Sequence, residues 1–411
     1  MYELTYVRTG TLEWRERPAP TLVEATDALV RPFVASRCDG DTVPLHKNVS
    51  RPMQAAIKIG MIDPVVSSIV GGVPFQGPFG IGHEAIAQVT EIGEQVTDLS
   101  VGDVVVVPWA VACGTCYECG LGLTAKCSTL SALSPGKTLA AFGFGPTSGE
   151  WGGMVADTLR VPFADFNLVT LPDGLDPLRV AAASDNLSDA WRSIVPPLAL
   201  RPGGKVLVIG GGGQSIGLYA AGLAVAHGAS VVDYLDDRDT RLEIAGSFGA
   251  DPHKVDKKRN NTLLASVPDR YDVVVEASSK LQGLRDAIRA LRAGGICTGT
   301  GYYLNTGTRI PVMDMYATSA TLNVGVSHVQ PLLPDLLDFV HNTGFPAENV
   351  TTLLADWDDA PEAYVAHTTK VVLHRQPTSI SPDTPDPPNC QLPTTNYRLP
   401  TTGEKTCHRS S

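Results

Sequence analysis

The sequence lacks any long apolar run, any excess of basic residues and any basic segment at its start. Its apolar runs, such as 104–112 and 218–226, reach about half the length that a transmembrane helix needs. Lys and Arg number 32 against 43 Asp and Glu, a net charge of −11, which argues against nucleic acid or a membrane surface as a partner. No secretory signal is expected, so the predicted location is the cytoplasm.

Cysteine is also sparse, and four of the eight cysteines fall within fifteen positions. Cys113, Cys116, Cys119 and Cys127 stand three, three and eight positions apart. Thiolates this close in sequence can converge on one Zn²⁺ in the closed tetrahedral arrangement of a structural site. The alternatives are two disulfides or four buried thiols, and disulfides need an oxidising compartment that nothing else in the sequence indicates.

The chain changes its pattern about midway. The first 165 or so residues predict a β domain punctuated by turns, with strands expected at 28–34, 87–93, 101–108, 152–156 and 159–162. From about residue 187, short apolar runs alternate with helical patterns, which predicts an α/β unit with a parallel sheet and helices on both faces.

The last residues have a different composition. Residues 376–411 are rich in Pro and Thr and hold almost no aliphatic clusters, so we expect them to be disordered. Cys390 and Cys407 lie there, and we interpret them as incidental thiols.

A glycine-rich turn follows the buried strand predicted at 205–209. Glycines there let the backbone approach a pyrophosphate, and the helix that follows offers unpaired N–H groups to its charge. The turn is irregular, because Gln214 stands where the middle glycine of G-x-G-x-x-G is expected, and a tight packing turn is the alternative. The candidate cofactor-binding residues of this turn are Gly210, Gly212, Gly213, Ser215, Ile216 and Gly217.

Asp236 supports the dinucleotide interpretation. It ends the next predicted strand, 19 residues beyond Gly217, where a carboxylate can bind the ribose hydroxyls and repel a 2′-phosphate. Asp237 adds to that repulsion, whereas Arg238 could hold a 2′-phosphate. We therefore expect NAD(H) in preference to NADP(H), and we count Asp236 and Arg241 among the candidate cofactor-binding residues.

Three isolated residues are potential ligands of a second metal. They are Cys38, His83 and Asp185, with Glu84 beside His83 as a possible outer partner. Spacing alone would not select them, because a lone Cys or His is more often a core residue than a ligand.

The order of these motifs resembles that of the zinc-dependent medium-chain alcohol dehydrogenases. Gly82-His83-Glu84, the cysteine cluster, the dinucleotide unit and Asp236 occur in the family's order, and the resemblance covers residues 1–375. It implies a GroES-like β-barrel-type catalytic domain and a doubly wound Rossmann sheet. The domains implied are a catalytic one at 1–185 and 325–375 with its zinc lobe at 113–127, and an NAD-binding one at 186–324.

The resemblance also assigns roles. It implies that Cys38, in a C-x-x-D setting with Asp41, binds a catalytic zinc together with His83 and Asp185, so that each chain holds two zinc ions. The activity implied is hydride transfer between NAD(H) and an alcohol, aldehyde or ketone of small size. The family also suggests a homodimer or homotetramer.

The sequence departs from the family near the first ligand. Gly40 and Val43 stand where many members have a hydroxyl residue and a histidine that relay a proton, so His46, Asp41 or water would have to serve. Asp189 stands where the family often has threonine, at a position that contacts the substrate and the nicotinamide in that family.

Two other functions fit the same fold. One is a zinc-free, NADPH-dependent reductase of enones or quinones, which would keep only the cysteine cluster's metal. The other is a dinucleotide-binding protein without catalysis.

Overall fold

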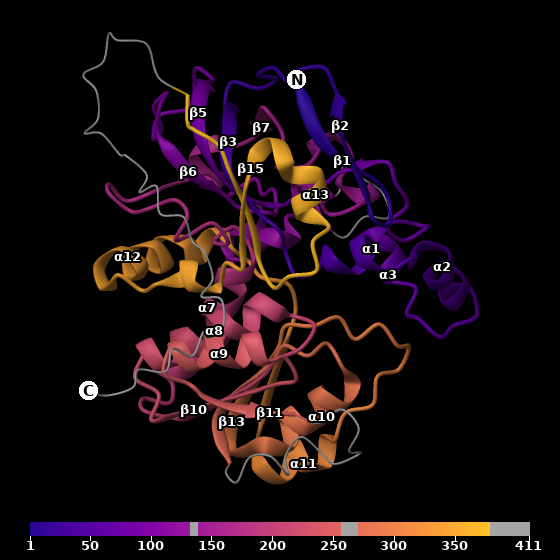
Figure 1. Ribbon diagram of the computed structural model, residues 1–411, viewed down its shortest axis with the longest axis vertical. Coiled ribbons are helices and arrows are strands. Elements are labelled where there is room, and N and C mark those ends of the chain that lie inside the picture. The colour runs from indigo at the N-terminus through magenta and orange to yellow at the C-terminus, as the bar shows by residue number, and fades with distance from the viewer. Residues whose placement is uncertain (132–138, 256–269, 379–411) are drawn as a thin grey trace, which may run out of the picture. The chain divides into compact units, whose positions relative to one another are not determined.

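Both ends of the described chain contribute to one largely antiparallel sheet (Figure 1). The computed structural model describes residues 1–131, 139–255 and 270–378, and Met1–Pro377 pack as one unit. β16 (Val371–His374) pairs antiparallel with β3 (Ala28–Ser36), which pairs in turn with β5 (Glu84–Ile92). Strands about 340 residues apart in sequence thus become neighbours, which makes long-range pairing the basis of this lobe.

The sheet order is β15-β16-β3-β5-β6-β8, and β7 also pairs with β3. Three further strands form a separate small sheet in the order β2-β1-β4. The other strands of these two sheets are β1 (Tyr2–Arg8), β2 (Thr11–Glu16), β4 (Phe79–Gly80), β6 (Val104–Val107), β7 (Leu159–Val161), β8 (Val169–Thr170) and β15 (Leu353–Asp356).

The second lobe is built on a parallel sheet. Its order is β11-β10-β9-β12-β13-β14, and every pairing in it is parallel. Its central strand, Lys-Val-Leu-Val-Ile, has four fully buried apolar side chains, as expected for a strand covered on both faces. The strands are β9 (Lys205–Ile209), β10 (Val231–Asp236), β11 (Asp251–Lys254), β12 (Tyr271–Glu276), β13 (Leu291–Gly299) and β14 (Thr321–Val324).

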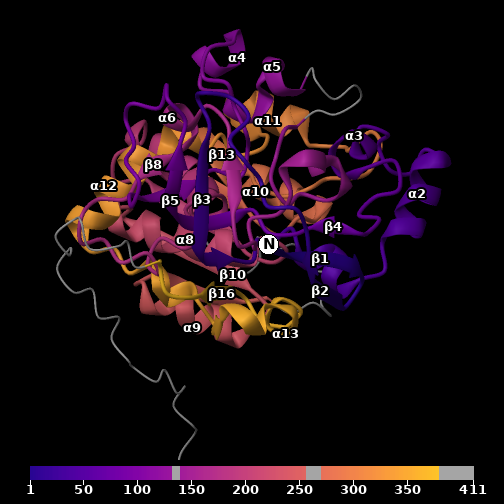
Figure 2. The same cartoon turned by 90° about the horizontal axis from the view of Figure 1, so that it is seen from above.

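Helices cover both faces of this parallel sheet. The strand order runs outward from β9 in two directions, and right-handed crossovers then place the two sets of helices on opposite faces. Figures 1 and 2 show α8 and α9 on one face and α10 and α11 on the other. The α-helices described are α1 (Thr42–His46), α2 (Ser50–Lys58), α3 (Val66–Val70), α4 (Tyr117–Gly120), α5 (Ser128–Ser131), α6 (Ala164–Asn167), α7 (Asn186–Ala199), α8 (Gln214–Ala226), α9 (Asp239–Ser247), α10 (Leu281–Ala290), α11 (Val312–Thr318), α12 (Leu333–Thr343) and α13 (Ala360–Tyr364).

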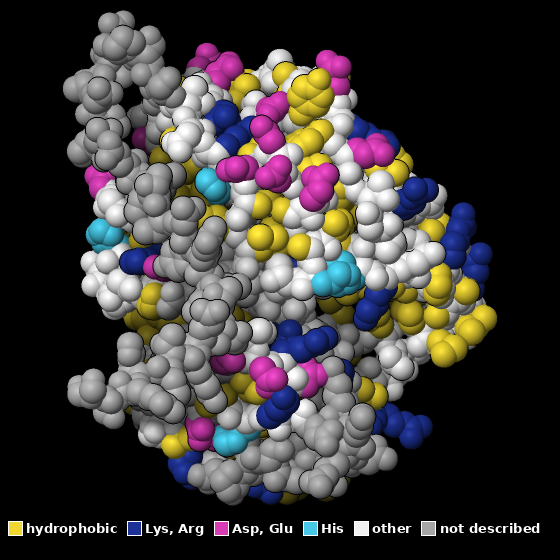
Figure 3. Space-filling model, viewed as in Figure 1, with side chains coloured by type: hydrophobic (Ala, Val, Ile, Leu, Met, Phe, Trp, Pro, Cys, Tyr) yellow, Lys and Arg dark blue, Asp and Glu magenta, His cyan; other side chains and the backbone are white. Residues whose placement is uncertain are grey.

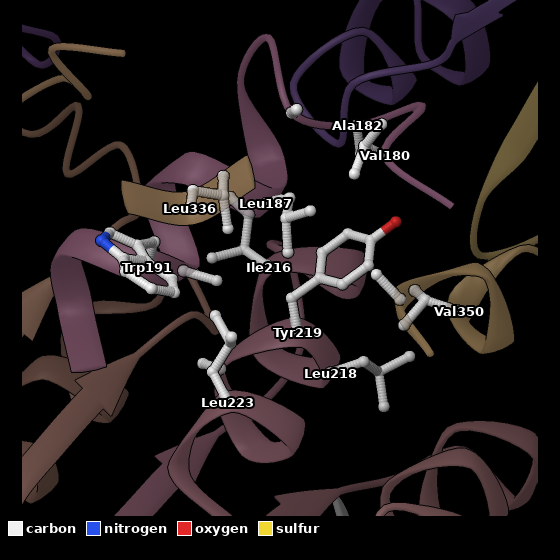
Figure 4. Packing of buried hydrophobic residues seen from close by; sticks show 14 of the residues in the cluster. Val180, Ala182, Leu187, Trp191, Ile216, Leu218, Tyr219, Leu223, Leu336 and Val350 are labelled. Carbon is white, nitrogen blue, oxygen red and sulfur yellow. The ribbon is translucent and has the colours of Figure 1, made fainter. Parts of the chain in front are cut away.

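The largest core cluster joins the two lobes through α7, α8 and α12. Figure 4 shows Tyr219 and Leu223 of α8 facing Leu187 and Trp191 of α7, with Leu336 of α12 close by. Helix α8 is apolar on all sides and almost wholly buried, so it packs against the sheet and against α7 at once. The start of α8 is therefore held in place by the core behind it.

The segment between β3 and β5 forms the short helices α1 to α3 at one edge of the unit. Figures 1 and 2 place α2 there, and Figure 3 shows apolar side chains on that edge. Ile59, Met61 and Val65 are 71%, 64% and 52% exposed. The same segment brings Phe75 to the candidate site described below.

The prediction of an α/β fold with a parallel sheet and a second β domain is confirmed. The expected strand at 152–156 is wrong: only Ala156 makes an isolated bridge, to Glu3, while Leu159–Val161 is a strand as expected. The disorder predicted for 376–411 concerns residues that, from 379 onward, lie outside the described ones. None of the described helices is long and apolar enough to span a membrane.

Arg37 fastens the end of β3 to the C-terminal part of the lobe. Its side chain is 1% exposed, and its guanidinium donates hydrogen bonds of 2.6–2.7 Å to the carbonyl oxygens of Tyr364, Ala366 and Thr368. Its backbone N–H donates to Val371 O at 3.0 Å. One cation thus pairs three carbonyls of the chain that connects α13 to β16.

We predict that Arg37→Met lowers the free energy of unfolding by about 3 kcal/mol or more, because buried carbonyls without a donor cost about 1–3 kcal/mol each. Urea unfolding followed by circular dichroism measures this. Arg15→Met is the matched control, since the Arg15–Glu13 pair is exposed and should change stability by less than about 1 kcal/mol. Equal effects of the two substitutions would contradict the account.

Candidate active site and metal centres

The four clustered cysteines converge as their spacing predicts. The sulfur atoms of Cys113, Cys116, Cys119 and Cys127 all lie within 4.8 Å of one another. No disulfide joins any cysteines in the described part of the chain. Four sulfurs gathered without disulfide bonds match the donor set of a closed tetrahedral zinc site, which leaves no open position for chemistry.

Backbone groups prepare this cluster for a cation. The N–H of Cys116 donates to Cys113 Sγ at 3.3 Å, and the N–H of Cys113 donates to Cys127 Sγ at 3.3 Å. Burial disfavours the thiolate of Cys116, but hydrogen bonds from the N–H of Cys119 and from Ser128 outweigh it and lower the pKa of Cys116 to about 6. Hydrogen bonds also lower the pKa of Cys113, whereas burial raises the pKa of Cys127 and raises that of Cys119 to about 12, so two of the four sulfurs favour thiolate, the form that binds metal.

Cys38, His83 and Asp185 also meet, although they are far apart in sequence. One ligand atom from each lies within 4.8 Å of the others. Cys38 Sγ lies 3.0 Å from Asp185 Oδ2, and His83 Nε2 lies 3.5 Å from the same oxygen. Cys38 follows β3 and His83 precedes β5, and Ser36 pairs with Glu84 across these strands, so both ligands lie at one end of the sheet.

Gly82 sets the position of His83. Its φ is +96°, and a Cβ there would lie 2.6 Å from Val155 Cγ2. Only glycine therefore fits before the histidine, both for its backbone conformation and for its close packing.

The surroundings of His83 are buried and negatively charged, which favours a cation. Both ring nitrogens are buried and have no hydrogen-bond partner among the described residues. Asp41 Oδ1 lies 3.7 Å from Nδ1, and Asp185 Oδ2 lies 3.5 Å from Nε2. Burial alone would lower the pKa of His83, but Asp41 and Asp185 outweigh it and raise that pKa to about 9. Burial, together with the neighbouring carboxylates, also raises the pKa of Cys38 well above its usual value. Buried donors with surplus negative charge nearby fit a bound Zn²⁺ with Cys, His and Asp ligands.

Asn186 connects this cluster to helix α8. Its Nδ2 donates to Cys38 Sγ at 3.3 Å and to Asp185 Oδ2 at 3.2 Å. Its Oδ1 accepts from Lys370 Nζ at 2.9 Å and from Ser215 Oγ at 3.0 Å. One buried amide therefore contacts two potential ligands on one side and α8 on the other.

Glu84 is a partner of Lys370 and lies outside the three-ligand set. The Lys370 ammonium bonds to Glu84 Oε2, and both side chains are wholly buried. Glu84 also accepts from Ser36 Oγ and, at 2.8 Å, from the N–H of Asn186. The carboxylate thus fixes the start of α7, where Asp185 stands.

A narrow pocket lies beside the three-ligand cluster. The Phe144 ring that lines it is 5.3 Å from the His83 ring, centroid to centroid. A Cβ on Gly40 would lie 3.6 Å from Cys38 Sγ and 3.9 Å from the Tyr302 ring, so the missing side chain leaves room that Tyr302 borders. The pocket is lined by Gly40, Asp41, Pro44, Phe75, Phe79, Phe144, Gly145 and Tyr302.

Tyr302 is a pocket residue that the sequence did not predict. It comes from the loop after β13, in the parallel-sheet lobe, and its hydroxyl has no hydrogen bond to any residue that the structure describes. The residue is 44% exposed, but the surroundings of its hydroxyl are crowded, and this burial, with the negative charge of Cys38 and Asp185, raises its pKa. It therefore offers a neutral phenol to the pocket.

His46, one of the proton routes considered, is engaged elsewhere. Its Nε2 lies 3.1 Å from Val365 O, and its ring stacks on His367 with centroids 4.0 Å apart. Asp41, another of those routes, lines the pocket directly and faces His83.

The glycine-rich turn lies at the carboxyl ends of the parallel strands. A Cβ on Gly210 would lie 2.5 Å from Asp236 Oδ2, and one on Gly212 would lie 2.9 Å from Ser279 Oγ. Glycine lets this turn pass close to its neighbours, at the edge where open α/β sheets bind ligands. Gly213 and Gly217 belong to the same turn and the first part of α8.

Asp236 and Arg241 form a buried bidentate pair at this edge. Arg241 Nε donates to Asp236 Oδ2 at 2.7 Å, and Arg241 Nη2 donates to Asp236 Oδ1 at 2.6 Å. Arg241 also reaches Gln214 Oε1 at 3.2 Å, so it ties the start of α8 to the end of β10. Both predicted cofactor residues are present at the turn, with Arg241 neutralising Asp236.

Ser215 and Ile216, two of the predicted cofactor-binding residues, contact a residue of the other lobe. Their backbone N–H groups donate to Asp39 Oδ2 at 2.8 and 3.1 Å. The structure thus shows a carboxylate of the chain itself at the start of α8.

Comparison with known proteins assigns the chain. Residues 25–173 match the family model described as alcohol dehydrogenase GroES-like domain, and residues 215–342 match the one described as zinc-binding dehydrogenase. A protein named "Probable zinc-binding alcohol dehydrogenase", from Mycobacterium tuberculosis (strain ATCC 25618 / H37Rv), is 30% identical over 295 residues, 72% of each chain. A glutathione-independent formaldehyde dehydrogenase of Pseudomonas aeruginosa (strain LESB58) is 36% identical over 173 residues, 41% of this chain and 42% of that protein.

A solved structure agrees over almost the whole described chain. The alcohol dehydrogenase TADH from Thermus sp. ATN1 superposes with a TM-score of 0.74 at 28% identity, covering 91% of this chain and 99% of that one. The predicted GroES-like and Rossmann architecture is therefore confirmed. The chain belongs to the zinc-dependent medium-chain dehydrogenase/reductase family, the alcohol dehydrogenases.

Proposed function

We propose that the protein is a zinc- and NAD-dependent oxidoreductase that interconverts a small alcohol and its aldehyde or ketone. The observation that carries the proposal is His83, whose two ring nitrogens are buried beside Cys38 and Asp185 and have no hydrogen-bond partner in the part of the chain that the structure describes. A buried polar atom without a partner costs free energy, so such a site is expected to be completed by a ligand.

The two clusters would hold zinc for different purposes. Cys113, Cys116, Cys119 and Cys127 supply a complete tetrahedron, which suits a structural ion. Cys38, His83 and Asp185 supply three ligands, which leaves a position for substrate. When bound, zinc supplies Lewis-acid polarisation of the alcohol or carbonyl oxygen, and the nicotinamide accepts or donates the hydride.

The chain's own residues orient these parts. Asn186 holds Cys38 and Asp185 in place, and the Glu84–Lys370 pair anchors Asn186 from behind. Phe144 shields His83 on the pocket side, and Tyr302 closes the pocket from the other lobe. Apolar walls of this kind exclude water and favour a small, largely apolar substrate.

The charge at the ribose edge supports NAD(H) over NADP(H). Asp236 and Asp237 bring two carboxylates, and Arg241 is already paired with Asp236. The Arg238 side chain is 68% exposed and lies 4.0 Å from Asp237, so it is the opposing feature. A 2′-phosphate would face two carboxylates at this edge, and both nearby arginines already lie beside those carboxylates.

We expect Cys38→Ser to remove one zinc per chain and to lower turnover of an alcohol panel with NAD⁺ by about 100-fold or more. Even outer partners of a metal ligand cost about 10–100-fold. Cys116→Ser should remove the other zinc and lower the thermal midpoint, and turnover per remaining folded protein should fall far less. Zinc is measured by mass spectrometry of the purified protein.

Cys297→Ser is the matched control, because Cys297 is a buried thiol outside both clusters. It should keep both zinc ions and the activity. A wild-type protein with one zinc, lost in Cys116→Ser and retained in Cys38→Ser, would favour the zinc-free reductase. Dinucleotide binding without turnover of any alcohol, aldehyde or ketone would favour a non-catalytic protein.

The cofactor preference has its own test. Asp236→Asn should raise the affinity for NADPH relative to NADH by at least about tenfold, because it weakens the acceptor for ribose and leaves Arg241 with surplus positive charge. A hydrogen bond to a charged group contributes about 1.5–3 kcal/mol, which corresponds to tenfold or more. Asp239→Asn, an exposed carboxylate at the start of α9 paired with Lys254, should leave the ratio unchanged. An unchanged ratio in Asp236→Asn would contradict the assignment.

A further inference from the structure

Asp39 crosses from the catalytic lobe to the start of helix α8. It follows Cys38 beyond the end of β3, and it is 5% exposed. Its Oδ2 accepts the backbone N–H groups of Ser215 and Ile216, at 2.8 and 3.1 Å. Its own backbone N–H donates to Asn186 Oδ1 at 3.1 Å, which fixes the carboxylate in this position.

These two N–H groups are the ones that a helix leaves without partners at its start. The first N–H groups of a helix have no acceptor within the helix, and the helix dipole favours an anion there. Because α8 follows a glycine-rich turn at the carboxyl edge of a parallel sheet, a phosphate of a dinucleotide would be expected to use the same donors. The structure shows the carboxylate of Asp39 in that role.

The Asp39 carboxylate has few polar contacts other than those with α8. Its Oδ1 is buried and has no hydrogen-bond partner in residues 1–131, 139–255 and 270–378. Lys370, whose charge acts on Asp39, is already bound to Glu84, Asn186 and the carbonyl oxygen of Arg37. Within the described residues, the hydrogen bonds that the Asp39 side chain accepts therefore all come from the first turn of α8.

We propose that Asp39 is an internal substitute for a dinucleotide phosphate, and that a dinucleotide has to displace it from α8 in order to bind. Two anions cannot share these donors, since like charges repel strongly in a buried site. Asp39 therefore lowers the affinity for the dinucleotide. Its release also frees the residue next to Cys38, which links cofactor binding to the metal-ligand side of the site. This inference rests on the proposed function, because it assumes a dinucleotide ligand.

The test compares binding constants of Asp39 variants, measured by titration of fluorescent NADH. Asp39→Asn removes the charge and should tighten NADH binding by roughly tenfold, the change expected when one charge repulsion is relieved. ADP-ribose, which carries the same two phosphates, should gain similarly in a competition titration. Adenosine, which carries none, should bind both proteins equally.

Asp165→Asn is the matched control. Asp165 also accepts two successive backbone N–H groups, those of Thr97 and Asp98 at 2.9 and 3.1 Å, but it is half-buried in α6 and does not contact the glycine-rich turn. It should leave all three affinities unchanged. Asp39→Ser, which shortens the side chain, gives a second variant, and thermal unfolding confirms that each variant is folded.

The outcomes separate this inference from the proposed function. NADH binding by wild type that is as tight as, or tighter than, that of folded Asp39→Asn and Asp39→Ser would overturn the inference and leave the proposed function intact. An equal gain for adenosine would also overturn it, because the effect would not follow the phosphates. Absence of NADH and NADPH binding in wild type and in both variants would overturn the inference and the proposed cofactor together. Binding that appears only in the variants would support the inference most strongly.

Discussion

The buried contact of Lys370 with Glu84 and Asn186 is the constraint on which the site depends. Lys370 precedes β16, Glu84 begins β5 and Asn186 begins α7, so three segments far apart in sequence meet at one ammonium group. A buried charge costs several kcal/mol unless it is paired and hydrogen-bonded, and Lys370 has three acceptors that satisfy it. The pair therefore fixes where Asn186 stands, and Asn186 fixes Cys38 and Asp185 in turn.

The same network explains why the proposed metal site lies next to the proposed dinucleotide site. The Asn186 amide has its two donors toward Cys38 and Asp185 and its oxygen toward Lys370, Ser215 and the N–H of Asp39. A small movement of α8 would therefore shift Asn186 and, through it, the proposed metal ligands Cys38 and Asp185. In a buried polar network each contact supports the others, so such coupling is a property of the network as a whole.

The sequence predicted the fold and one site well, for physical reasons. The cysteine cluster lies in one short loop, so spacing alone brings its sulfurs together. The strand predicted at 205–209 has those bounds in the structure, because a strand buried on both faces is a continuous apolar run. Cys38, His83 and Asp185 were found only through resemblance to a family, since no local pattern connects them.

Other parts of the site could not be predicted. Three residues contact partners more than 100 positions away, and no periodic pattern in a sequence predicts such contacts. They are Asn186, Lys370 and Tyr302. Asp39 was passed over for the same reason: its partner is a helix start 176 positions away. The pairing of Asp236 with Arg241 is shorter in range, but a sequence pattern does not show that the two groups neutralise each other.

The central claim is that Cys38, His83 and Asp185 bind a metal ion distinct from the one held by the four cysteines. Anomalous diffraction from crystals of the zinc-loaded protein, recorded on both sides of the zinc absorption edge, tests it most directly. The account predicts two zinc peaks per chain, one within each cluster. A single peak among Cys113, Cys116, Cys119 and Cys127 would contradict it if no peak lay among Cys38, His83 and Asp185.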